Sequence, residues 1–213
     1  MGEIMEYEYD IFVSYKRYGE WTNWVRGEFY NVLRDHLAME LGDDPKIFID
    51  NQLESGTDWP SDLARKLTTS RVLVPLFSKM YFGSEWCLKE FYAARFKEDQ
   101  IGLRTPQRSS GIIVPARIHD GTENDLPAHL QECCRVHAED FTEYAITSLR
   151  RNSPRFESFE EKVKTWVKQS VKPAIDRTAG TKPEQTWLTR ISNQEFRCPP
   201  PASFERLRFP SLA

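Results

Sequence analysis

The sequence predicts an α/β fold in which helices cover both faces of a parallel β-sheet. Short apolar runs rich in β-branched and aromatic residues, typical of buried strands, recur along the chain. Segments with apolar residues every three or four positions, typical of amphipathic helices, lie between them. Because the two patterns alternate and five strands are expected, we predict a flavodoxin-like three-layer sandwich with strand order 2-1-3-4-5.

The first two strands and the helix between them have clear signals. "YDIFVSY" at 9–15 is an apolar strand, and "KIFID" at 46–50 is a second, shorter one. Helical spacing of apolar residues runs from Glu20 to Leu41, and Gly42 is placed to end that helix. A polar, turn-rich loop, "NQLESGTDWP", follows the second strand and leads into a helix at about 61–68.

The middle of the chain contains the third and fourth strands. "RVLVPLF" at 71–77 is the third strand, and Ser84 is placed to cap a helix that runs to about Lys97. We expect the buried side of that helix to carry Cys87 and its apolar neighbours. A long polar connection, "EDQIGLRTPQRSSG", then leads into a fourth strand, "IIVPARI" at 112–118.

The last third of the chain has weaker signals. A helix is expected near 126–132, a short fifth strand in "RVHAEDF" at 135–141, and an amphipathic helix at 156–175. Beyond it, "TAGTKPEQ" and "CPPPASF" are rich in turn residues. We therefore expect one domain at 7–176 and an irregular C-terminal extension at 177–213.

The bulk composition excludes several classes of protein. The net charge of −3 provides no general attraction to nucleic acid or to anionic membranes. No apolar run approaches the roughly 20 residues of a membrane span, and the acidic start lacks the apolar segment of a signal peptide. The four cysteines and four histidines show no metal-ligand spacing, so we expect no metal site and a cytoplasmic protein with reduced thiols.

The predicted topology places a ligand site between the first and third strands. In open α/β sheets, ligands bind beyond the carboxyl ends of the strands, where the strand order reverses. The segment after the first strand is "SYKR" (14–17), and "SKMYFGSEWCLKE" (78–90) follows the third. The loop at 50–60 opens on the same edge. Three polar or aromatic segments are therefore expected to converge there.

Trp86 and Glu90 are the candidates within the segment that follows the third strand. At about 100° per residue they share one helix face, beside the face that would carry the apolar residues. Glu90 is then either a partly exposed carboxylate beside a half-buried tryptophan, or a reactive carboxylate beside an aromatic platform. The spacing of the two residues leaves both interpretations open.

Taken together, these segments resemble a Toll/interleukin-1 receptor (TIR) domain over roughly residues 7–175. "YDIFVSYKR" resembles the first conserved box of the family, and "FID" followed by "LESG" resembles its second strand and loop. "RVLVPLFSKMYFGSEWCLKEF" resembles the segment in which a Trp-Cys-x-x-Glu motif follows the third strand. The three boxes occur in the family's order and at appropriate spacing.

The resemblance implies an activity for one branch of the family. In that branch, TIR domains cleave NAD+ to nicotinamide and ADP-ribose or a cyclic ADP-ribose isomer, and the glutamate of the Trp-x-x-x-Glu arrangement is catalytic. Glu90 occupies that position in this sequence. The resemblance thus implies an NAD+ nucleosidase in immune, cell-death or anti-phage signalling, with NAD+ as substrate and without a cofactor.

The resemblance also implies residues that contact the nucleotide: Lys16, Arg17, Asp50, Glu54, Trp59 and Trp86. Lys16 and Arg17 would bind the pyrophosphate, or else form a solvated basic turn. Trp86 would stack on a flat ring of the substrate, or else support the start of its helix. Asp50 either contacts the nucleotide or caps its loop. The loop that carries Glu54 and Trp59 is one residue longer than the family pattern.

Three functions remain to be compared. The first is the NAD+-cleaving enzyme, which would self-associate through TIR–TIR contacts and could signal through a cyclic product to a separate effector. The second is a non-enzymatic TIR adaptor, which has no need of Trp86 and Glu90. The third is a flavodoxin-like nucleotide binder or response regulator, and the basic "SYKR" stands against it because a phosphoacceptor site needs acidic residues there. Whether the product is linear or cyclic is left open.

Overall fold

The computed structural model describes residues 5–49, 59–104, 109–119, 136–146 and 148–193. Its sheet is parallel and five-stranded, with order β2-β1-β3-β4-β5, which confirms the predicted topology. The strands are β1 (Tyr9–Ser14), β2 (Ile47–Ile49), β3 (Ser70–Phe77), β4 (Ala116–Arg117) and β5 (Glu139–Asp140). The central strand β1 pairs with β2 on one side and with β3 on the other.

The fourth strand is much shorter than the predicted run at 112–118. Regular pairing is confined to Ala116–Arg117, and Ile113 forms an isolated bridge to Leu73 of β3. Pro115 lies between the two paired positions. Because proline has no backbone N–H to donate, it interrupts the ladder at that point.

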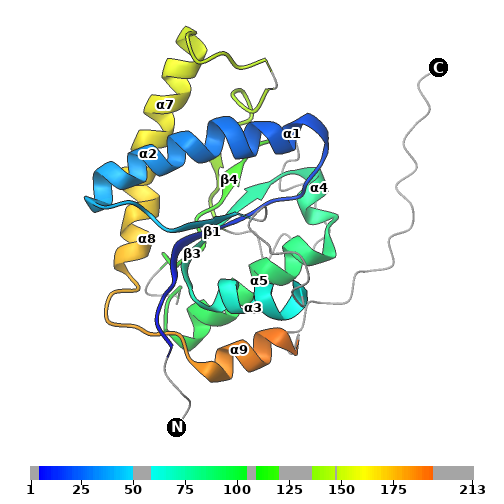
Figure 1. Ribbon diagram of the computed structural model, residues 1–213, viewed down its shortest axis with the longest axis vertical. Helices are drawn as coiled ribbons and strands as arrows, with labels where there is room; N and C mark the ends of the chain where they lie inside the picture. Colours follow the sequence, from blue (N-terminus) through cyan, green and yellow to red (C-terminus); the bar gives the residue numbers. More distant parts are fainter. Residues whose placement is uncertain (1–4, 50–58, 105–108, 120–135, 147, 194–213) are drawn as a thin grey trace, which may run out of the picture.

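Helices cover both faces of the sheet, as predicted (Figure 1). One face is covered by α1 (Gly19–Trp24), α2 (Tyr30–Leu41), α7 (Pro154–Trp166) and α8 (Lys172–Asp176). The other is covered by α3 (Trp59–Thr68), α4 (Lys79–Phe82), α5 (Glu85–Gln100) and α9 (Gln185–Ser192). Alternate residues of β1 point to opposite faces, with Ile11 and Val13 in one core and Phe12 in the other.

Two of the predicted helices contain a turn of π-helix. The helix expected at 20–41 consists of α1, the π-helical η1 (Val25–Phe29) and α2. The helix expected at 156–175 likewise contains η4 (Val167–Val171) between α7 and α8. Gly42 ends α2 in the left-handed conformation, with φ of 74°, as its position in the sequence predicts.

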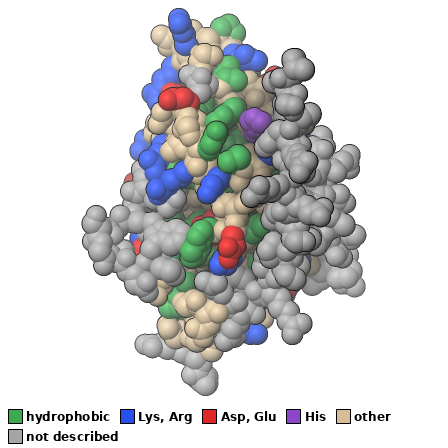
Figure 2. Space-filling view, turned by 90° about the vertical axis from the view of Figure 1, so that its right-hand side faces the viewer, with side chains coloured by type: hydrophobic (Ala, Val, Ile, Leu, Met, Phe, Trp, Pro, Cys, Tyr) green, Lys and Arg blue, Asp and Glu red, His purple; other side chains and the backbone are tan. Residues whose placement is uncertain are grey.

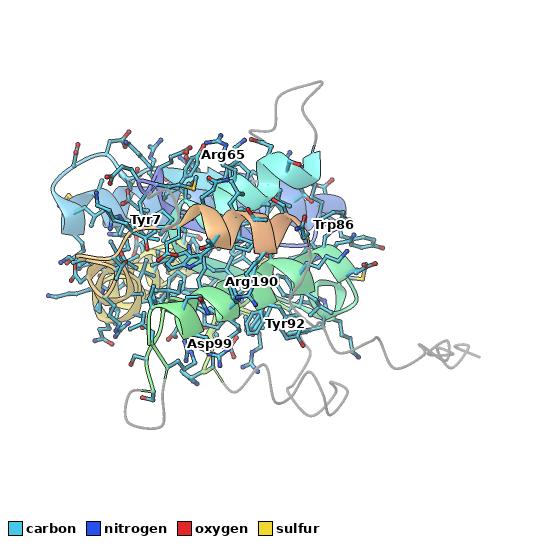
Figure 3. The ribbon with its side chains drawn as sticks, turned by 90° about the horizontal axis from the view of Figure 1, so that it is seen from below. Tyr7, Arg65, Trp86, Tyr92, Asp99 and Arg190 are labelled. Carbon is cyan, nitrogen blue, oxygen red and sulfur yellow. The ribbon has the colours of Figure 1, made fainter. Side chains whose placement is uncertain are left out.

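The segment after residue 177 contains a helix, although the sequence predicts an irregular extension there. Helix α9 packs alongside α3 and α5 (Figure 3), and its Trp187 and Ile191 are buried. Backbone pairing of Met5 N with Pro183 O, at 2.9 Å, ties the segment before α9 to the start of the described chain. The helix expected at 126–132 lies outside the described residues. Within the described ranges, every helix is too short or too polar to traverse a bilayer.

Candidate active site at the carboxyl edge of the sheet

The carboxyl ends of β1 and β3 lie side by side and define the candidate site. Ser14, the last residue of β1, pairs in register with Pro75 of β3. Both strands point toward the right-hand side of Figure 1, where α4 also lies. That side faces the viewer in Figure 2, which shows basic side chains gathered in its upper half and an acidic side chain beside a basic one near its middle. This is the edge at which the strand order reverses, as the sequence predicts.

Glu90 is directed toward the end of the central strand. The Ser14 hydroxyl donates a hydrogen bond to Glu90 Oε2, so a residue of β1 and one of α5 meet at the carboxyl edge of the sheet. Ser14 is buried, whereas Glu90 is partly exposed. A carboxylate on the outer face of a helix has no such partner in the sheet. The structure therefore favours a carboxylate held at the site over one that is merely solvated.

Tyr81 completes a chain of hydroxyl groups beneath Glu90. Its hydroxyl lies 3.1 Å from Ser14 Oγ and donates to the carbonyl of Cys87 at 3.0 Å. Tyr81 is fully buried in α4, whose first turn is capped by Ser78. Sequence reasoning missed both Ser14 and Tyr81 as site residues. The available signal for Ser14 was its place at the end of the central strand.

The start of α5 fixes the position of the Trp-x-x-x-Glu pair. Ser84 Oγ accepts from Cys87 N at 3.5 Å, which confirms the predicted cap. Cys87 and Phe91 are buried, so Glu90 emerges beside the apolar face of the helix, as its spacing predicts. Cys87 packs in the core, as expected from its position in the helix.

Trp86 presents part of its indole ring at the surface. Its side chain is 37% exposed, and it lies at the end of α5 that belongs to the site edge (Figure 3). The ammonium of Lys89 sits 4.8 Å from the centroid of the Trp86 ring and 2.7 Å from a carboxylate oxygen of Glu85. Trp86 is therefore not a buried support for its helix, and it offers an aromatic surface near the site.

The other predicted contact residues have different outcomes. Lys16 and Arg17 are exposed and follow Ser14 directly after Tyr15, so the structure brings two cations to the site edge. Asp50 and Glu54 lie outside the described residues. Trp59 is the first residue of α3, and its side chain lies outside the described part. In the described ranges, no three His, Cys, Asp or Glu side chains are grouped to hold a metal ion.

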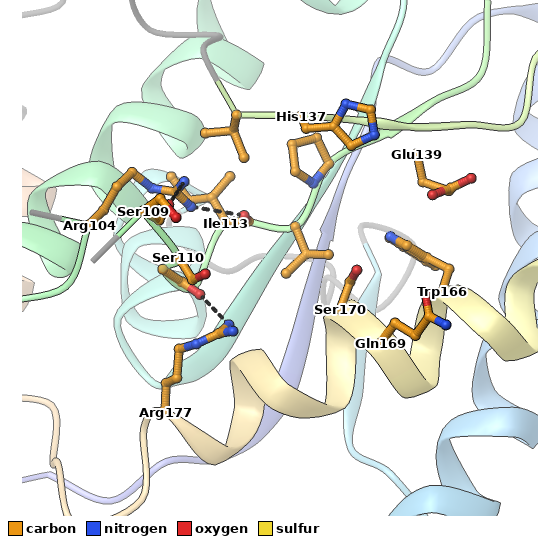
Figure 4. A pocket seen from close by; sticks show the side chains of 14 residues that line it. Arg104, Ser109, Ser110, Ile113, His137, Glu139, Trp166, Gln169, Ser170 and Arg177 are labelled. Carbon is orange, nitrogen blue, oxygen red and sulfur yellow. Dashed lines mark hydrogen bonds between the residues drawn. The ribbon is translucent and has the colours of Figure 1, made fainter. Parts of the chain in front are cut away.

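A separate cavity of about 250 Å³ lies where the chain enters β4 and β5, away from the carboxyl edge (Figure 4). Arg104, His137, Trp166 and Arg177 are among its lining residues. Its arginines already bond to the scaffold. Arg104 donates to the carbonyls of Ser109 (3.0 Å) and Ile113 (3.2 Å), and Arg177 donates to that of Gly111 (3.2 Å). The cavity lies apart from the Ser14–Tyr81–Glu90 cluster.

A family model described as the TIR domain matches residues 11–151. Among curated proteins, the chain is 35% identical over 138 residues to Protein SUPPRESSOR OF npr1-1, CONSTITUTIVE 1 of Arabidopsis thaliana, covering 62% of this chain. It is 30% identical over 103 residues to TMV resistance protein N of Nicotiana glutinosa, covering 46% of this chain. In each case the match spans only 8% of the relative's length.

Two solved structures are also similar. One is the TIR domain of the Toll-related receptor TRR-2 from Hydra magnipapillata, with 15% identity and a TM-score of 0.41, covering 73% of this chain and 98% of that one. The other contains the TIR domains of the activated Roq1 resistosome, with 21% identity and a TM-score of 0.40, covering 81% of this chain and 98% of that one.

Proposed function

The chain belongs to the TIR domain family, and from this premise we propose that it is an enzyme that cleaves the N-glycosidic bond of NAD+. The products would be nicotinamide and either ADP-ribose or a cyclic ADP-ribose isomer. The observation that carries this proposal is the hydrogen bond from Ser14 to Glu90, which holds the carboxylate of the Trp-x-x-x-Glu motif beside the end of β1 at the carboxyl edge.

The reaction suits a site with one directed carboxylate. In most glycosidases a second carboxyl group protonates the leaving group. The nicotinamide of NAD+ is a pyridinium, and it departs as a neutral molecule when it keeps the electron pair of the broken bond. No general acid is needed at that step. The ribosyl group becomes cation-like, and either water bonds to its anomeric carbon and releases a proton to the solvent, or a nucleophilic atom of the ADP-ribosyl group itself bonds there and closes a ring.

Glu90 would stabilise the cation-like ribosyl group. A fixed anion beside that group lowers the energy of the transition state more than that of the neutral-ribose ground state. Because Glu90 is held by a residue of the sheet, its carboxylate is already oriented before the reaction. Trp86, with its partly exposed ring, would stack on a flat ring of the substrate.

The remaining residues would bind the nucleotide. Lys16 and Arg17 are exposed cations at the site edge, suited to the pyrophosphate. For Asp50, Glu54 and Trp59 the proposal rests on the family resemblance in the loop after β2. No cofactor or metal is required by this chemistry.

The biological setting is part of the same proposal. The name of TMV resistance protein N associates that relative with resistance to a virus, and we extend a role in defence signalling to this chain. Self-association through TIR–TIR contacts and a cytoplasmic location are proposed with it. A cyclic product would act on a separate effector.

The test is an NAD+ turnover assay on concentrated protein, in which the nucleotide products are separated and their masses are determined. We expect nicotinamide release by the wild-type chain and a loss of at least 100-fold in Glu90→Ala, because the anion acts in the transition state. Asp99→Asn is the matched control, since Asp99 is an exposed carboxylate farther along the same helix. Equal release by wild type and Glu90→Ala would overturn the mechanism. If neither wild type nor Glu90→Ala releases nicotinamide at high protein concentration, the non-enzymatic TIR adaptor is favoured.

A further inference from the structure

Ser14 joins the end of the central strand to the Glu90 carboxylate, and we propose that Ser14, supported by Tyr81, is the positioning residue that fixes Glu90 for its reaction. This inference rests on the proposed function, because it assigns a task within the same site. It concerns two buried hydroxyl groups for which neither the sequence motif nor the family resemblance supplied a role.

The Ser14 hydroxyl is held in place by the sheet. Its strand lies between β2 and β3, and the preceding Val13 is paired on both sides, with Ile49 and with Val74. The Ser14 side chain is almost fully buried. Glu90, in contrast, is a long side chain at a partly exposed position, where several rotamers compete. A bond from a fixed hydroxyl to the carboxylate favours one of these rotamers.

The direction of the hydrogen bonds follows from the number of protons. An ionised carboxylate only accepts hydrogen bonds, and serine has a single hydroxyl proton. That proton therefore lies between Ser14 Oγ and Glu90 Oε2, so in the 3.1 Å contact with Ser14 the Tyr81 hydroxyl is the donor and shares its single proton between Ser14 and the Cys87 carbonyl. The Tyr81 proton has two acceptors within reach, Ser14 Oγ and the Cys87 carbonyl. A serine that accepts from Tyr81 is in turn a stronger donor to Glu90.

This arrangement has two effects on Glu90. A hydroxyl that donates to a carboxylate favours its ionised form, which is the form that can stabilise a ribosyl cation. It also holds the carboxylate at the end of β1 before the substrate arrives, so that less reorganisation is needed during the reaction. Ser14 itself need not touch the substrate to have either effect.

Four variants separate positioning from a purely structural role. Ser14→Ala removes the donor, Ser14→Thr keeps a hydroxyl, and Tyr81→Phe removes the second hydroxyl but keeps the ring. Ser70→Ala is the matched control, because Ser70 is also a buried strand serine of the same sheet, but it donates to the carbonyl of Lys66 at 2.6 Å. Ser70→Ala loses one buried hydrogen bond, whereas Ser14→Ala loses the contacts with both Glu90 and Tyr81, and Tyr81→Phe reports on the second of these by itself.

The kinetic readout is the pH profile of NAD+ cleavage. In Ser14→Ala we expect kcat to fall roughly 10-fold or more with little change in KM, because the carboxylate is misplaced rather than lost. The pH at which kcat falls to half on the acid side should rise by about one unit. Ser14→Thr should recover most of kcat, and Tyr81→Phe should shift in the same direction by less. An unchanged profile in Ser14→Ala would overturn the inference.

A second measurement does not depend on turnover. The carboxyl carbon of Glu90 is followed by NMR during a pH titration, with its signal assigned from its absence in Glu90→Gln. We expect the midpoint to move upward in Ser14→Ala and to stay in place in Ser70→Ala. If wild type cleaves NAD+ but the midpoint does not move, the inference fails and the proposed function stands. If the midpoint moves but wild type cleaves no NAD+, the proposed function fails. Ser14 would then position Glu90 for a task other than NAD+ cleavage.

Discussion

The ammonium group of Lys89 lies over the ring of Trp86, 4.8 Å from its centroid. Glu85, four residues before Lys89 in α5, forms an ion pair with that ammonium at 2.7 Å. A cation therefore already occupies one face of the indole that we expect to stack on the substrate. The nicotinamide ring of NAD+ also carries a positive charge, so the two cations would compete for the same ring face.

Replacing Lys89 should strengthen substrate binding. We expect Lys89→Met to lower KM for NAD+ about two- to five-fold, since a cation–π contact at an exposed site contributes about 0.5–1 kcal/mol. Steady-state kinetics at saturating and limiting NAD+ measure this change. Lys79→Met, which removes an exposed lysine of α4, is the control. A higher KM in Lys89→Met would mean that Lys89 binds the nucleotide instead of competing with it.

The ring of Trp86 itself should matter for KM more than for kcat. Trp86→Ala removes the stacking surface and should raise KM roughly 10-fold, while Trp86→Phe should retain part of the affinity. Steady-state kinetics with NAD+ measure the KM of both variants. A normal KM in Trp86→Ala would show that Trp86 does not bind the substrate.

The buried Lys97 should make stability depend on pH. Burial lowers the pKa of Lys97 from 10.5 to about 7 in the folded chain, where its Nζ donates to the carbonyls of Leu67 (3.1 Å) and Ser70 (2.5 Å). Between these two pKa values the unfolded chain holds a proton that the folded chain lacks. The free energy of unfolding should therefore rise with pH, by up to about 1.4 kcal/mol per unit.

Urea unfolding of wild type and Lys97→Met at pH 6.5, 8 and 9.5 measures this effect. Groups that titrate in both proteins cancel in the difference, so the difference isolates Lys97. It should change with pH between about 7 and 10 and be constant below that range. A difference that does not vary with pH would show that Lys97 keeps its proton in the folded state.

Gly111 should tolerate no side chain. A Cβ at this position would overlap Oε1 of Glu98 and lie 2.5 Å from its Cδ. Glu98 cannot move aside easily, because it is fully buried and accepts from Arg104 Nε (2.8 Å) and from the backbone N–H of Ile112 (2.8 Å). Gly111→Ala should therefore destabilise the fold by roughly 1–3 kcal/mol, as overpacking does.

Gly27→Ala is the matched control for Gly111→Ala. Gly27 lies in the helical η1, where a Cβ would meet no atom within 4 Å, so alanine should stabilise the helix by about 0.5–1 kcal/mol. Denaturant unfolding of the two variants should therefore give changes of opposite sign. Equal stability of Gly111→Ala and wild type would mean that Glu98 is not fixed as the structure has it.

Helix α9 should contribute to the stability of the whole domain. Its Trp187 is buried on the side of the sheet that α3 and α5 cover. Trp187→Ala should cost about 3 kcal/mol, as the loss of a buried aromatic ring does. Gln185→Ala, at an exposed position of the same helix, should have little effect. Similar thermal midpoints for Trp187→Ala and wild type would show that α9 is dispensable to the fold.

The sheet order and the position of Glu90 could be predicted from the sequence because both follow from local patterns. Apolar runs mark β1, β2 and β3, and the cap at Ser84 together with helical spacing sets the direction of Glu90. The short β4 was not predicted, since apolar composition at 112–118 conceals the effect of Pro115 on pairing. Helix α9 was missed because eight residues among turn-forming neighbours give little periodicity.

The partners of Glu90 could not be predicted in the same way. Ser14 is one of many serines, and only the packing of β1 against β3 brings its hydroxyl to a carboxylate far away in the sequence. Tyr81 has the features of a core aromatic, which it also is. Contacts of this kind depend on distances between elements, and hydrophobic periodicity contains no information about them.

The bond between Ser14 and Glu90 joins residues 76 positions apart. It can form only after β1 has paired with β3 and α5 has docked on the sheet, so neither the segment that ends in β1 nor the segment from β3 to α5 can form it alone. The contact between Ser14 and Glu90 therefore depends on the packing of several elements. It should vanish in the same cooperative transition that melts the core, and its recovery should mark the completion of refolding and not an early local step.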